Sequence, residues 1–421
     1  MIMKRTLIKN IGCLQTPVGS YSHKGSKQGI NEKFPNAAIA IEDGIIKAVT
    51  TDGKATTGFG NMPGKEEDFD EIIDAEGKLV TPGLFDGHTH LIFGGYRQHE
   101  IAMKLAGADY LDILRAGGGI LDTVRKTRMA TFEELYAKAE AFLDEMLDFG
   151  ITGCEAKSGY GLDPENELKM LEVIKALNEK HAMDVVPTFM GAHAVPPEYE
   201  GRGDEYIDMM CEELMPEVRQ RGLAEYADIF CEDSVFNAEQ SRKYMEKAAE
   251  LGFGLKIHAD EIEAIGGSQL AGEMGAASAE HLIAIEEDGM DSMAAGGTTA
   301  MLLPATSFYL GKTFAPAKRM IEKGIPVAIA SDFNPGSCPS LNLQFAINLG
   351  CLKYRMTPEE VLTAVTINPA CACGRGDLLG TLEVGKQADL VIWNAPDFEM
   401  VCYRFGSNLA QHVMKKGEMV K

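Results

Sequence analysis

The sequence of 421 residues predicts a (β/α)₈ TIM-like barrel with a small β-sandwich domain formed from both chain termini. In the middle of the chain, eight short apolar segments alternate with helical patterns, which is typical of parallel strands joined by helical crossovers. Eight such repeats favour a closed barrel over an open sheet. Both chain ends carry short strands and turns instead. We therefore expect a composite β domain from residues 1–80 and 382–421 and a barrel from residues 81–381.

The β-rich ends are predicted from apolar runs that are separated by turn residues. Two apolar runs within residues 38–49 flank Asp43-Gly44, a dipeptide that favours a tight hairpin turn. Residues 388–393 form an apolar run typical of a strand, and residues 413–420 predict a last hairpin. We interpret the two ends as one β domain; two separate appendages are the alternative.

The barrel repeats follow from helix start and stop signals. Thr131 and Glu134 form a capping box, Gly150 ends that helix, and Pro164 opens the next one. Later helices are predicted at 204–221, 238–251, 267–274, 286–295 and 315–323. The eight strands are predicted at 84–85, 151–156, 185–190, 227–231, 254–257, 277–280, 299–303 and 326–330.

The composition restricts the possible partners. A formal net charge of −23 argues against nucleic acid or an anionic membrane as a partner, because the protein would repel both. An anionic substrate would therefore need a local cationic group. No apolar run reaches the roughly 18–20 residues of a membrane span, and the first residues lack the apolar core of a signal peptide. Nine cysteines, an odd number, favour reduced thiols, so we expect a cytoplasmic protein.

Histidines gather at the ends of the predicted strands. A barrel of this kind carries its active site at the carboxyl ends of its strands. Five of the nine histidines lie at such ends, and an aspartate follows the eighth strand. These residues are His88, His90, His193, His258, His281 and Asp332.

His88 and His90 are the first sign of a metal site. On an extended strand, side chains two residues apart point to the same face, so the two imidazoles converge and Thr89 points away. Neutral imidazoles are suitable ligands for a divalent metal. Taken alone, this pair is equally well explained as two ordinary histidines at a polar strand end. His258 and Asp332 decide the matter, because a barrel brings them to the same rim.

This pattern of histidines and aspartate resembles that of the amidohydrolase superfamily. The resemblance implies a metal held by His88, His90, His258 and Asp332, with His281 near the attacking water. Some members hold two metals bridged by a modified lysine at the end of the fourth strand. That strand ends here in Cys-Glu-Asp at 231–233, without a lysine. We therefore expect one zinc or iron ion per subunit.

Five longer sequence segments narrow the resemblance to those amidohydrolases that open an imidazolone ring bearing a propionate tail. The implied reaction hydrolyses the ring C–N bond of 4-imidazolone-5-propanoate to N-formimidoyl-L-glutamate, in histidine degradation. Glu280 and Ser331 stand where the resemblance predicts Asp and Thr, and Cys338 replaces a small polar residue. The five segments are residues 90–97, Tyr110 with 117–120, 157–162, 191–199 and 332–337.

The resemblance also suggests catalytic roles. Asp332 would accept the proton of the attacking water, and His281 would orient that water. Glu261, three residues after His258, would carry a proton to the leaving nitrogen, or else support a ligand histidine by a hydrogen bond. His193 would polarise the ring carbonyl, or else be an ordinary loop histidine.

A carboxylate tail on the substrate calls for a bidentate cationic partner. Arg97, seven residues after His90, is the leading candidate. Tyr160 is a second donor, and Tyr110 is a weaker one. The loop after Asp332 could contact the ring or tail through Asn334, Gly336 and Ser337.

Two other functions remain open from the sequence. One is a mononuclear aminohydrolase of the cytosine- or guanine-deaminase kind, which would use the same metal site. The other is a barrel without catalysis that serves as a scaffold; retention of the whole ligand set argues against it. The resemblance also suggests a homodimer.

Overall fold

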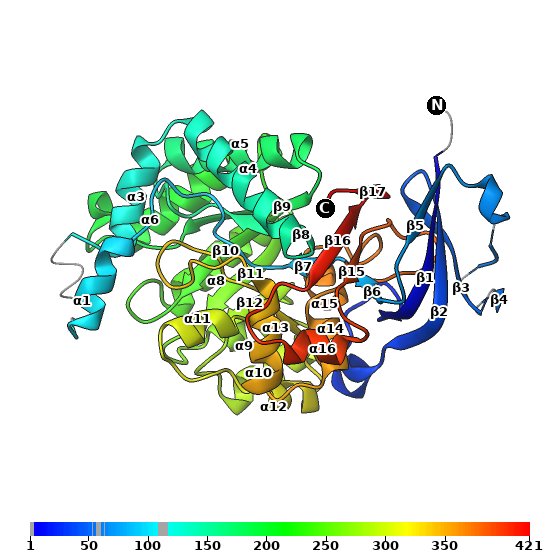
Figure 1. Cartoon of the computed structure of the whole chain (residues 1–421). Helices are drawn as coiled ribbons and strands as arrows, with labels where there is room; N and C mark the ends of the chain where they lie inside the picture. Colours follow the sequence, from blue (N-terminus) through cyan, green and yellow to red (C-terminus); the bar gives the residue numbers. More distant parts are fainter. Residues whose placement is uncertain (1–3, 53, 56–59, 63, 108–116) are drawn as a thin grey trace.

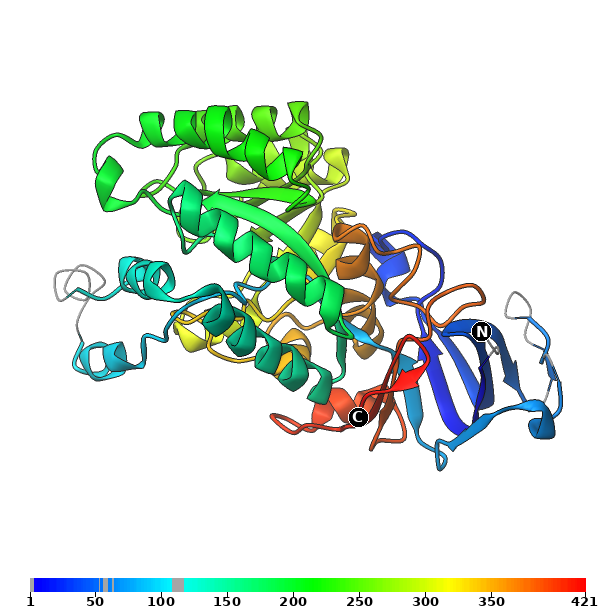
Figure 2. The same ribbon diagram turned by 90° about the horizontal axis from the view of Figure 1, so that it is seen from above.

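The computed structural model describes residues 4–52, 54–55, 60–62, 64–107 and 117–421. Tyr110 lies outside the described residues. The chain forms a barrel surrounded by helices and a separate β sheet that contains both ends of the described chain (Figure 1). Figure 2 shows the same division from above, with the sheet on one side of the barrel.

Eight parallel strands form the barrel, as the sequence predicts. Their order in the sheet follows the chain, from β7 to β14, and each strand pairs with the next. Buried side chains dominate every one of them, as expected for strands enclosed by helices, and most strands are rich in apolar residues, whereas β12 contains Ser278, Glu280 and His281. The strands are β7 (Leu84–Asp86), β8 (Ile151–Lys157), β9 (Asp184–Ala192), β10 (Tyr226–Cys231), β11 (Gly254–Ala259), β12 (Ser278–His281), β13 (Thr299–Leu302) and β14 (Val327–Ile329).

The barrel closes just beyond the ends of its first and last strands. Thr89 and Phe333 form an isolated parallel bridge. The backbone N–H of His90 donates to the carbonyl of Phe333 at 2.9 Å, and that of Asp332 donates to the carbonyl of His88 at 3.1 Å. The seam therefore joins the two segments that carry three of the predicted metal ligands.

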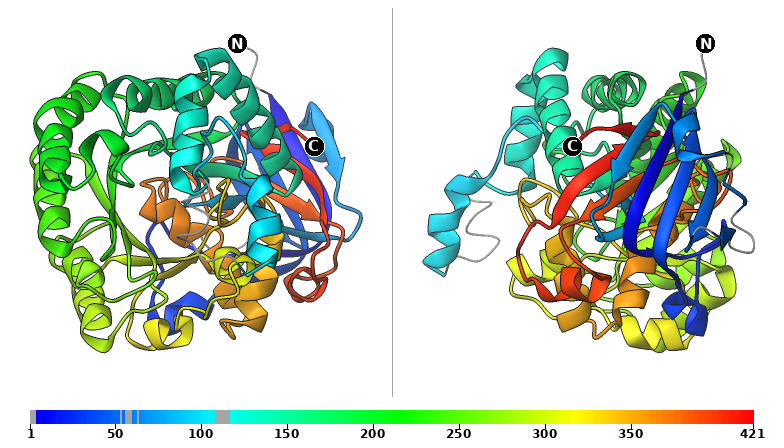
Figure 3. Two further views of the ribbon diagram at one scale, coloured as in Figure 1. Left: turned by 90° about the vertical axis from the view of Figure 1, so that its left-hand side faces the viewer. Right: turned by 45° about the vertical axis from the view of Figure 1, so that its right-hand side comes forward.

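Helices cover the outside of the barrel (Figure 3, left). The capping box of Thr131 and Glu134 starts α4, and Asp163 caps α5, which begins at Pro164. The helix predicted at 204–221 is α6 and α7 with a π-helical turn, Met210–Leu214, between them. The helices of the barrel are α1 (Ile101–Leu105), α3 (Ile120–Met129), α4 (Phe132–Asp148), α5 (Pro164–Lys180), α6 (Gly203–Met209), α7 (Met215–Gln220), α8 (Ala238–Glu250), α9 (Gly267–Glu273), α10 (Glu287–Gly296), α11 (Pro304–Tyr309) and α12 (Ala317–Glu322).

Four helices follow the last barrel strand, and the sequence reading did not predict them. They pack against one another and against the barrel; α13 contacts α11, α14 and α16. Their bounds are α13 (Leu343–Leu352), α14 (Pro358–Ala364), α15 (Ile367–Ala372) and α16 (Phe398–Tyr403). No helix among the described residues has the length and apolar character needed to cross a membrane.

The second sheet joins the two chain ends (Figure 3, right). It has nine strands, and β15 pairs antiparallel with β6, which connects the C-terminal strands to the N-terminal ones. The predicted hairpin at Asp43-Gly44 is present, and both residues have the positive φ of a type I′ turn. The strands are β1 (Arg5–Thr16), β2 (Glu32–Glu42), β3 (Ile45–Thr51), β4 (Lys54–Ala55), β5 (Glu71–Asp74), β6 (Leu79–Pro82), β15 (Leu390–Trp393), β16 (Ala410–Lys415) and β17 (Glu418–Met419).

Candidate active site

The predicted site residues meet at the carboxyl rim of the barrel. His258 and His281 lie at the ends of their strands, whereas His88 and His90 lie just past the end of β7 rather than on it. His281 and Asp332 have positive φ angles of 70° and 54°. Positive φ angles are uncommon outside glycine, and active sites are one of the places where they cluster.

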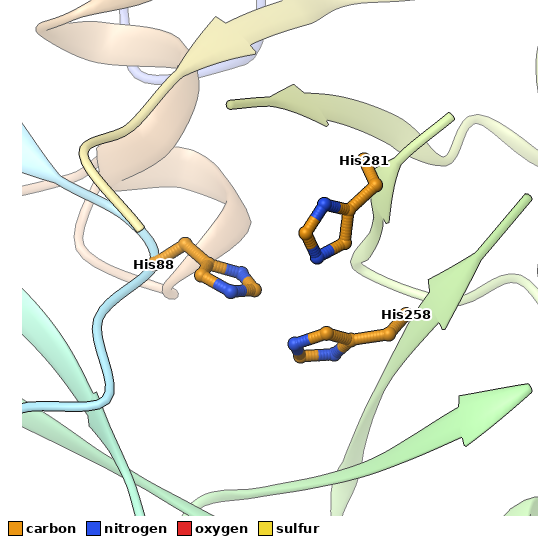
Figure 4. A group of neighbouring side chains, drawn as sticks. All are labelled: His88, His258 and His281. Atoms are coloured by element: carbon orange, nitrogen blue, oxygen red, sulfur yellow. The ribbon is translucent and has the colours of Figure 1, made fainter. Parts of the chain in front are cut away.

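Five side chains surround one point. Ligand-type atoms of His88, His258 and His281 lie within 4.8 Å of one another, and so do those of His88, His90 and Asp332. Figure 4 shows the rings of the first group turned toward a common space. Oδ1 of Asp332 lies 3.5 Å from Nε2 of His88 and 3.7 Å from Nε2 of His90. His88 belongs to both groups and is the centre of the cluster.

Two carboxylates orient the histidines from behind. Glu280 lies 2.7 Å from Nδ1 of His88, and Asp228 lies 3.1 Å from Nδ1 of His258. A hydrogen on each Nδ1 leaves the lone pair of Nε2 directed away from the carboxylate. Among the described residues, Nε2 of His88 is buried without a hydrogen-bond partner. Convergent imidazole nitrogens, one carboxylate and an unsatisfied buried nitrogen fit a divalent metal ion.

The protonation states agree with a ligand set. Burial lowers the pKa of His88, His90 and His258, so the imidazoles are neutral, as metal ligands must be. Burial raises the pKa of Asp332 to about 6, against the opposing effects of His281 and of Thr306. The hydroxyl of Thr306 donates to Oδ2 of Asp332 at 2.5 Å and so fixes the carboxylate.

A network of buried charged side chains lies beneath the cluster, and it was not predicted from the sequence. Nζ of Lys157 lies 2.7 Å from Asp228 and 2.8 Å from Glu155, and Lys256 lies 3.3 Å from Glu155. All five charged side chains, including Glu280, are completely buried. The available signal was a charged residue in the middle of an otherwise apolar strand, as at Asp228 in β10.

A cavity of about 480 Å³ opens above the cluster. It is lined by four of the five cluster residues and by most of the predicted substrate contacts. The lining residues from the prediction are His90, Arg97, Tyr160, His193, His258, Glu261, His281, Asp332, Asn334 and Ser337. The cavity therefore connects the candidate metal ligands with Arg97, the predicted partner of a carboxylate.

Gly336 lies behind Arg97 rather than in the cavity lining. A Cβ atom on Gly336 would lie 1.0 Å from Nη2 of Arg97, so the guanidinium rests directly on this glycine. The amide of Asn334 is engaged by its own loop: it accepts from the N–H groups of Gly336 and Ser337 and donates to the carbonyl of Asp332. In this structure Asn334 shapes the loop on which Arg97 rests.

His193 and Tyr160 form one wall of the cavity. The ring of His193 stacks on that of His90 with centroids 4.8 Å apart, and Tyr160 lies 5.3 Å from His193. Burial lowers the pKa of His193 to about 3. Its Nδ1 lies 3.1 Å from the carbonyl of Gly159, so Nδ1 donates and Nε2 is left as an acceptor. Neutral His193 therefore suits an N–H group better than a carbonyl oxygen.

Glu261 stands at the opposite side of the cluster. Its carboxylate lies 3.7 Å from Nε2 of His281 and 3.6 Å from Nζ of Lys312. Burial would raise the pKa of Glu261, but His281 and Lys312 outweigh it and lower the pKa. Buried Glu232 accepts hydrogen bonds from the N–H groups of Ile262 and Glu263, which holds the backbone next to Glu261.

The fold and the site define a metal-dependent hydrolase of the barrel type, and comparisons with known proteins agree. The amidohydrolase family model matches residues 79–420. The Imidazolonepropionase of Alkaliphilus metalliredigens is 51% identical over 100% of this chain and 98% of its own length. That of Treponema denticola is 50% identical over 94% of each chain. The chain belongs to the amidohydrolase family and, within it, to the imidazolonepropionases.

Solved structures support the fold at greater evolutionary distance. A crystal structure of an adenosine deaminase from Xanthomonas campestris with bound zinc superposes with a TM-score of 0.68 and 18% identity, over 98% of this chain and 92% of that one. The relatives at about half identity are named Imidazolonepropionase and not deaminase. The aminohydrolase alternative from the sequence is therefore the less well supported one.

Proposed function

We propose that the protein hydrolyses the ring C–N bond of 4-imidazolone-5-propanoate to N-formimidoyl-L-glutamate, a step of histidine degradation. The observation that carries this proposal is a single cavity in which a buried His and Asp cluster faces a guanidinium. The cluster suits hydrolysis of a cyclic amide, and Arg97 suits the propionate. The relatives at about half identity support the same substrate.

We propose that His88, His90, His258 and Asp332 hold one zinc or iron ion per subunit. A bound divalent ion would lower the pKa of a water molecule to about 7 and so supply a nucleophile at neutral pH. The choice between zinc and iron stays open, because both accept imidazole and carboxylate ligands. Ligand-type atoms of His281, like those of His258, lie within 4.8 Å of those of His88, so the role of His281 beside the water is a separate point to test.

Asp332 and His281 act on the attacking water. The pKa of Asp332, raised by burial to about 6, suits a carboxylate that accepts a proton from water near neutral pH. Thr306 keeps that carboxylate in place. His281, on the same rim, orients the water through a ring nitrogen.

Glu261, His193 and Arg97 act on the substrate. The oxygen of the water adds to the carbonyl carbon of the ring, and the C–N bond breaks. The proton that Asp332 takes from the water then reaches the leaving nitrogen through Glu261. His193 accepts a hydrogen bond from a ring N–H through Nε2. The carbonyl-polarising role expected from the sequence would need a hydrogen on Nε2, and therefore either a protonated ring or the tautomer that gives up the hydrogen bond to Gly159. Arg97 binds the propionate in bidentate fashion, and Tyr160 closes the cavity beside it.

The decisive experiment is turnover by the metal-loaded enzyme. Protein reconstituted with zinc or with iron should hydrolyse 4-imidazolone-5-propanoate, measured as a decrease in its ultraviolet absorbance, and mass spectrometry should detect N-formimidoyl-L-glutamate. Cytosine and guanine serve as the aminohydrolase control and should release no ammonia. Absence of turnover with both metals would refute the assignment.

The ligand set is tested separately. His258→Ala should lose its metal on dialysis, whereas His281→Ala should retain metal but lose activity. Retention of metal by His258→Ala would show that the proposed set is wrong. A homodimer and a cytoplasmic location stay predictions; light scattering tests the first.

A further inference from the structure

Glu167 is a buried carboxylate next to the site that the proposed mechanism does not use. It lies in the first turn of α5, and its partners are backbone groups of the loop before that helix and the side chain of Ser158. Oε1 accepts from the N–H groups of Gly159, Gly161 and Leu162 at 3.1, 2.8 and 2.9 Å, and Oε2 accepts from Gly159 at 3.1 Å. Among the described residues no cation forms an ion pair with Glu167. Burial raises the pKa of its carboxyl group, and the hydrogen bonds from these N–H groups and from Ser158 oppose that effect.

The loop that Glu167 binds has an unfavourable backbone conformation. Leu162 has a φ of 54° and Gly159 a φ of 107°. A leucine in the left-handed region is uncommon and persists only where its surroundings hold it. A Cβ atom at position 159 would lie 2.9 Å from Nδ1 of His193, so the close approach of this loop to His193 also requires glycine. The hydrogen bonds from Gly159, Gly161 and Leu162 to the carboxylate stabilise this loop conformation.

The same loop carries two contacts of the proposed substrate site. Tyr160 lies between the two glycines that Glu167 binds, and it lines the cavity. The carbonyl of Gly159 accepts from Nδ1 of His193 at 3.1 Å. Movement of Gly159 would therefore displace Tyr160. It would also break the hydrogen bond that keeps the hydrogen of His193 on Nδ1.

We propose that Glu167 is a positioning residue for substrate binding. By holding the N–H groups of the loop, it places the carbonyl of Gly159 so that His193 keeps its hydrogen on Nδ1 and offers Nε2 to an N–H of the substrate ring. It also keeps Tyr160 in the cavity wall. This inference rests on the proposed function for its kinetic consequence, but the tautomer of His193 is a property of the protein alone.

The experiment compares Glu167→Ala and Glu167→Gln with a matched control. Gln344→Ala is suitable, because Gln344 is also buried, accepts from the N–H of Leu409 at 2.8 Å, donates to the carbonyl of Phe149 at 2.9 Å and does not line the cavity. All variants are purified with metal and compared in metal content, thermal stability and kinetics. A purely structural role predicts that Glu167→Ala and Gln344→Ala behave alike.

The expected kinetic result is specific to Glu167. In Glu167→Ala, kcat/KM for 4-imidazolone-5-propanoate should fall by about 10- to 100-fold, the size of effect caused by small displacements of positioned groups, with unchanged metal content. Glu167→Gln should lose less, because its amide oxygen can replace Oε1 as an acceptor. Gln344→Ala should lower the melting temperature with less than about a twofold change in kcat/KM.

Nitrogen-15 NMR of the histidine rings, with His193→Gln used for assignment, supplies the second readout. The wild type should show His193 with hydrogen on Nδ1, and Glu167→Ala should show a mixture of tautomers. An unchanged tautomer, or a loss of kcat/KM no larger than in Gln344→Ala, would overturn the proposal. If Glu167→Ala does not fold, Glu167→Gln decides by the same criteria. A wild type that does not turn over the substrate refutes the proposed function, whereas the tautomer still tests Glu167.

Discussion

Oε2 of Glu280 lies 2.7 Å from Nδ1 of His88, and both side chains are completely buried in the barrel. The hydroxyl of Ser278 donates to the other oxygen of Glu280 at 2.5 Å. The carboxylate therefore has fixed partners on both sides, and it determines the direction in which Nε2 of His88 points. Glu280, which occupies a position where the resemblance predicts an aspartate, therefore supports His88, the central candidate ligand.

Glu280→Gln should weaken metal binding by about 10- to 100-fold, the usual effect of removing a hydrogen-bond partner of a ligand histidine. The amide keeps the shape of the side chain but cannot carry the negative charge that makes His88 a stronger ligand. Burial raises the pKa of Glu280 to about 7, so the difference between the two proteins should be largest above that pH. Competition with a chelating dye measures the affinity. Glu286→Gln, an exposed site close by in the sequence, should leave the affinity unchanged. Equal affinity in wild type and Glu280→Gln would contradict the supporting role.

Lys157→Met should destabilise the protein by about 3–5 kcal/mol, because Glu155 and Asp228 would be left as buried charges without their cation. Urea unfolding measures the change. Lys318→Met is the control: Lys318 also pairs with a glutamate, Glu360, but 41% of its side chain is exposed to solvent, so its loss should cost no more than about 1 kcal/mol. Similar losses in both variants would show that the buried network contributes little.

The barrel was predictable because its signal is local and repeated. Helices separate the strands, several of them start at a capping residue such as Thr131, Asp163 or Asn237, and the strand ends of such a barrel meet at one rim. The position of His258 beside His88 therefore followed from the order of the strands. The helices after β14 were missed because they do not belong to this repeat.

The supporting residues were harder to predict because their partners are distant in the sequence. Nothing near Glu280 indicates that it meets His88, 192 residues earlier. Glu167 reads as an ordinary helix residue, and its bonds to the preceding loop depend on the strained φ of Leu162. Charged residues inside strands, such as Asp228, were the one available signal.

Arg97→Ala should raise KM for 4-imidazolone-5-propanoate by at least about tenfold and change kcat little, because the tail lies away from the reacting bond. Arg97→Lys should recover part of the affinity but not all, since an ammonium lacks the planar pair of donors. Steady-state kinetics with a tail-less imidazolone provides the comparison. If both substrates lose affinity equally, Arg97 does not bind the carboxylate.

Gly336→Ala should affect Arg97 without unfolding the loop. The added methyl group would meet the end of the Arg97 side chain, at 1.0 Å from Nη2 and 2.0 Å from Cζ, and a flexible side chain moves more easily than backbone. Gly336 does not have a positive φ, so alanine fits the backbone itself. The expected result is a rise in KM similar to that of Arg97→Ala, with a melting temperature within about 2 °C of the wild type, since backbone packing is preserved.

The double variant tests whether the two residues act through one contact. If Gly336 matters because Arg97 rests on it, Gly336→Ala should add little to KM in a protein that already carries Arg97→Ala, and the two effects should not be additive. Additive effects would mean that the methyl group disturbs Asn334 or Ser337, whose hydrogen bonds shape the same loop. A large fall in melting temperature would lead to the same conclusion, because the loop backbone and not Arg97 would then have moved.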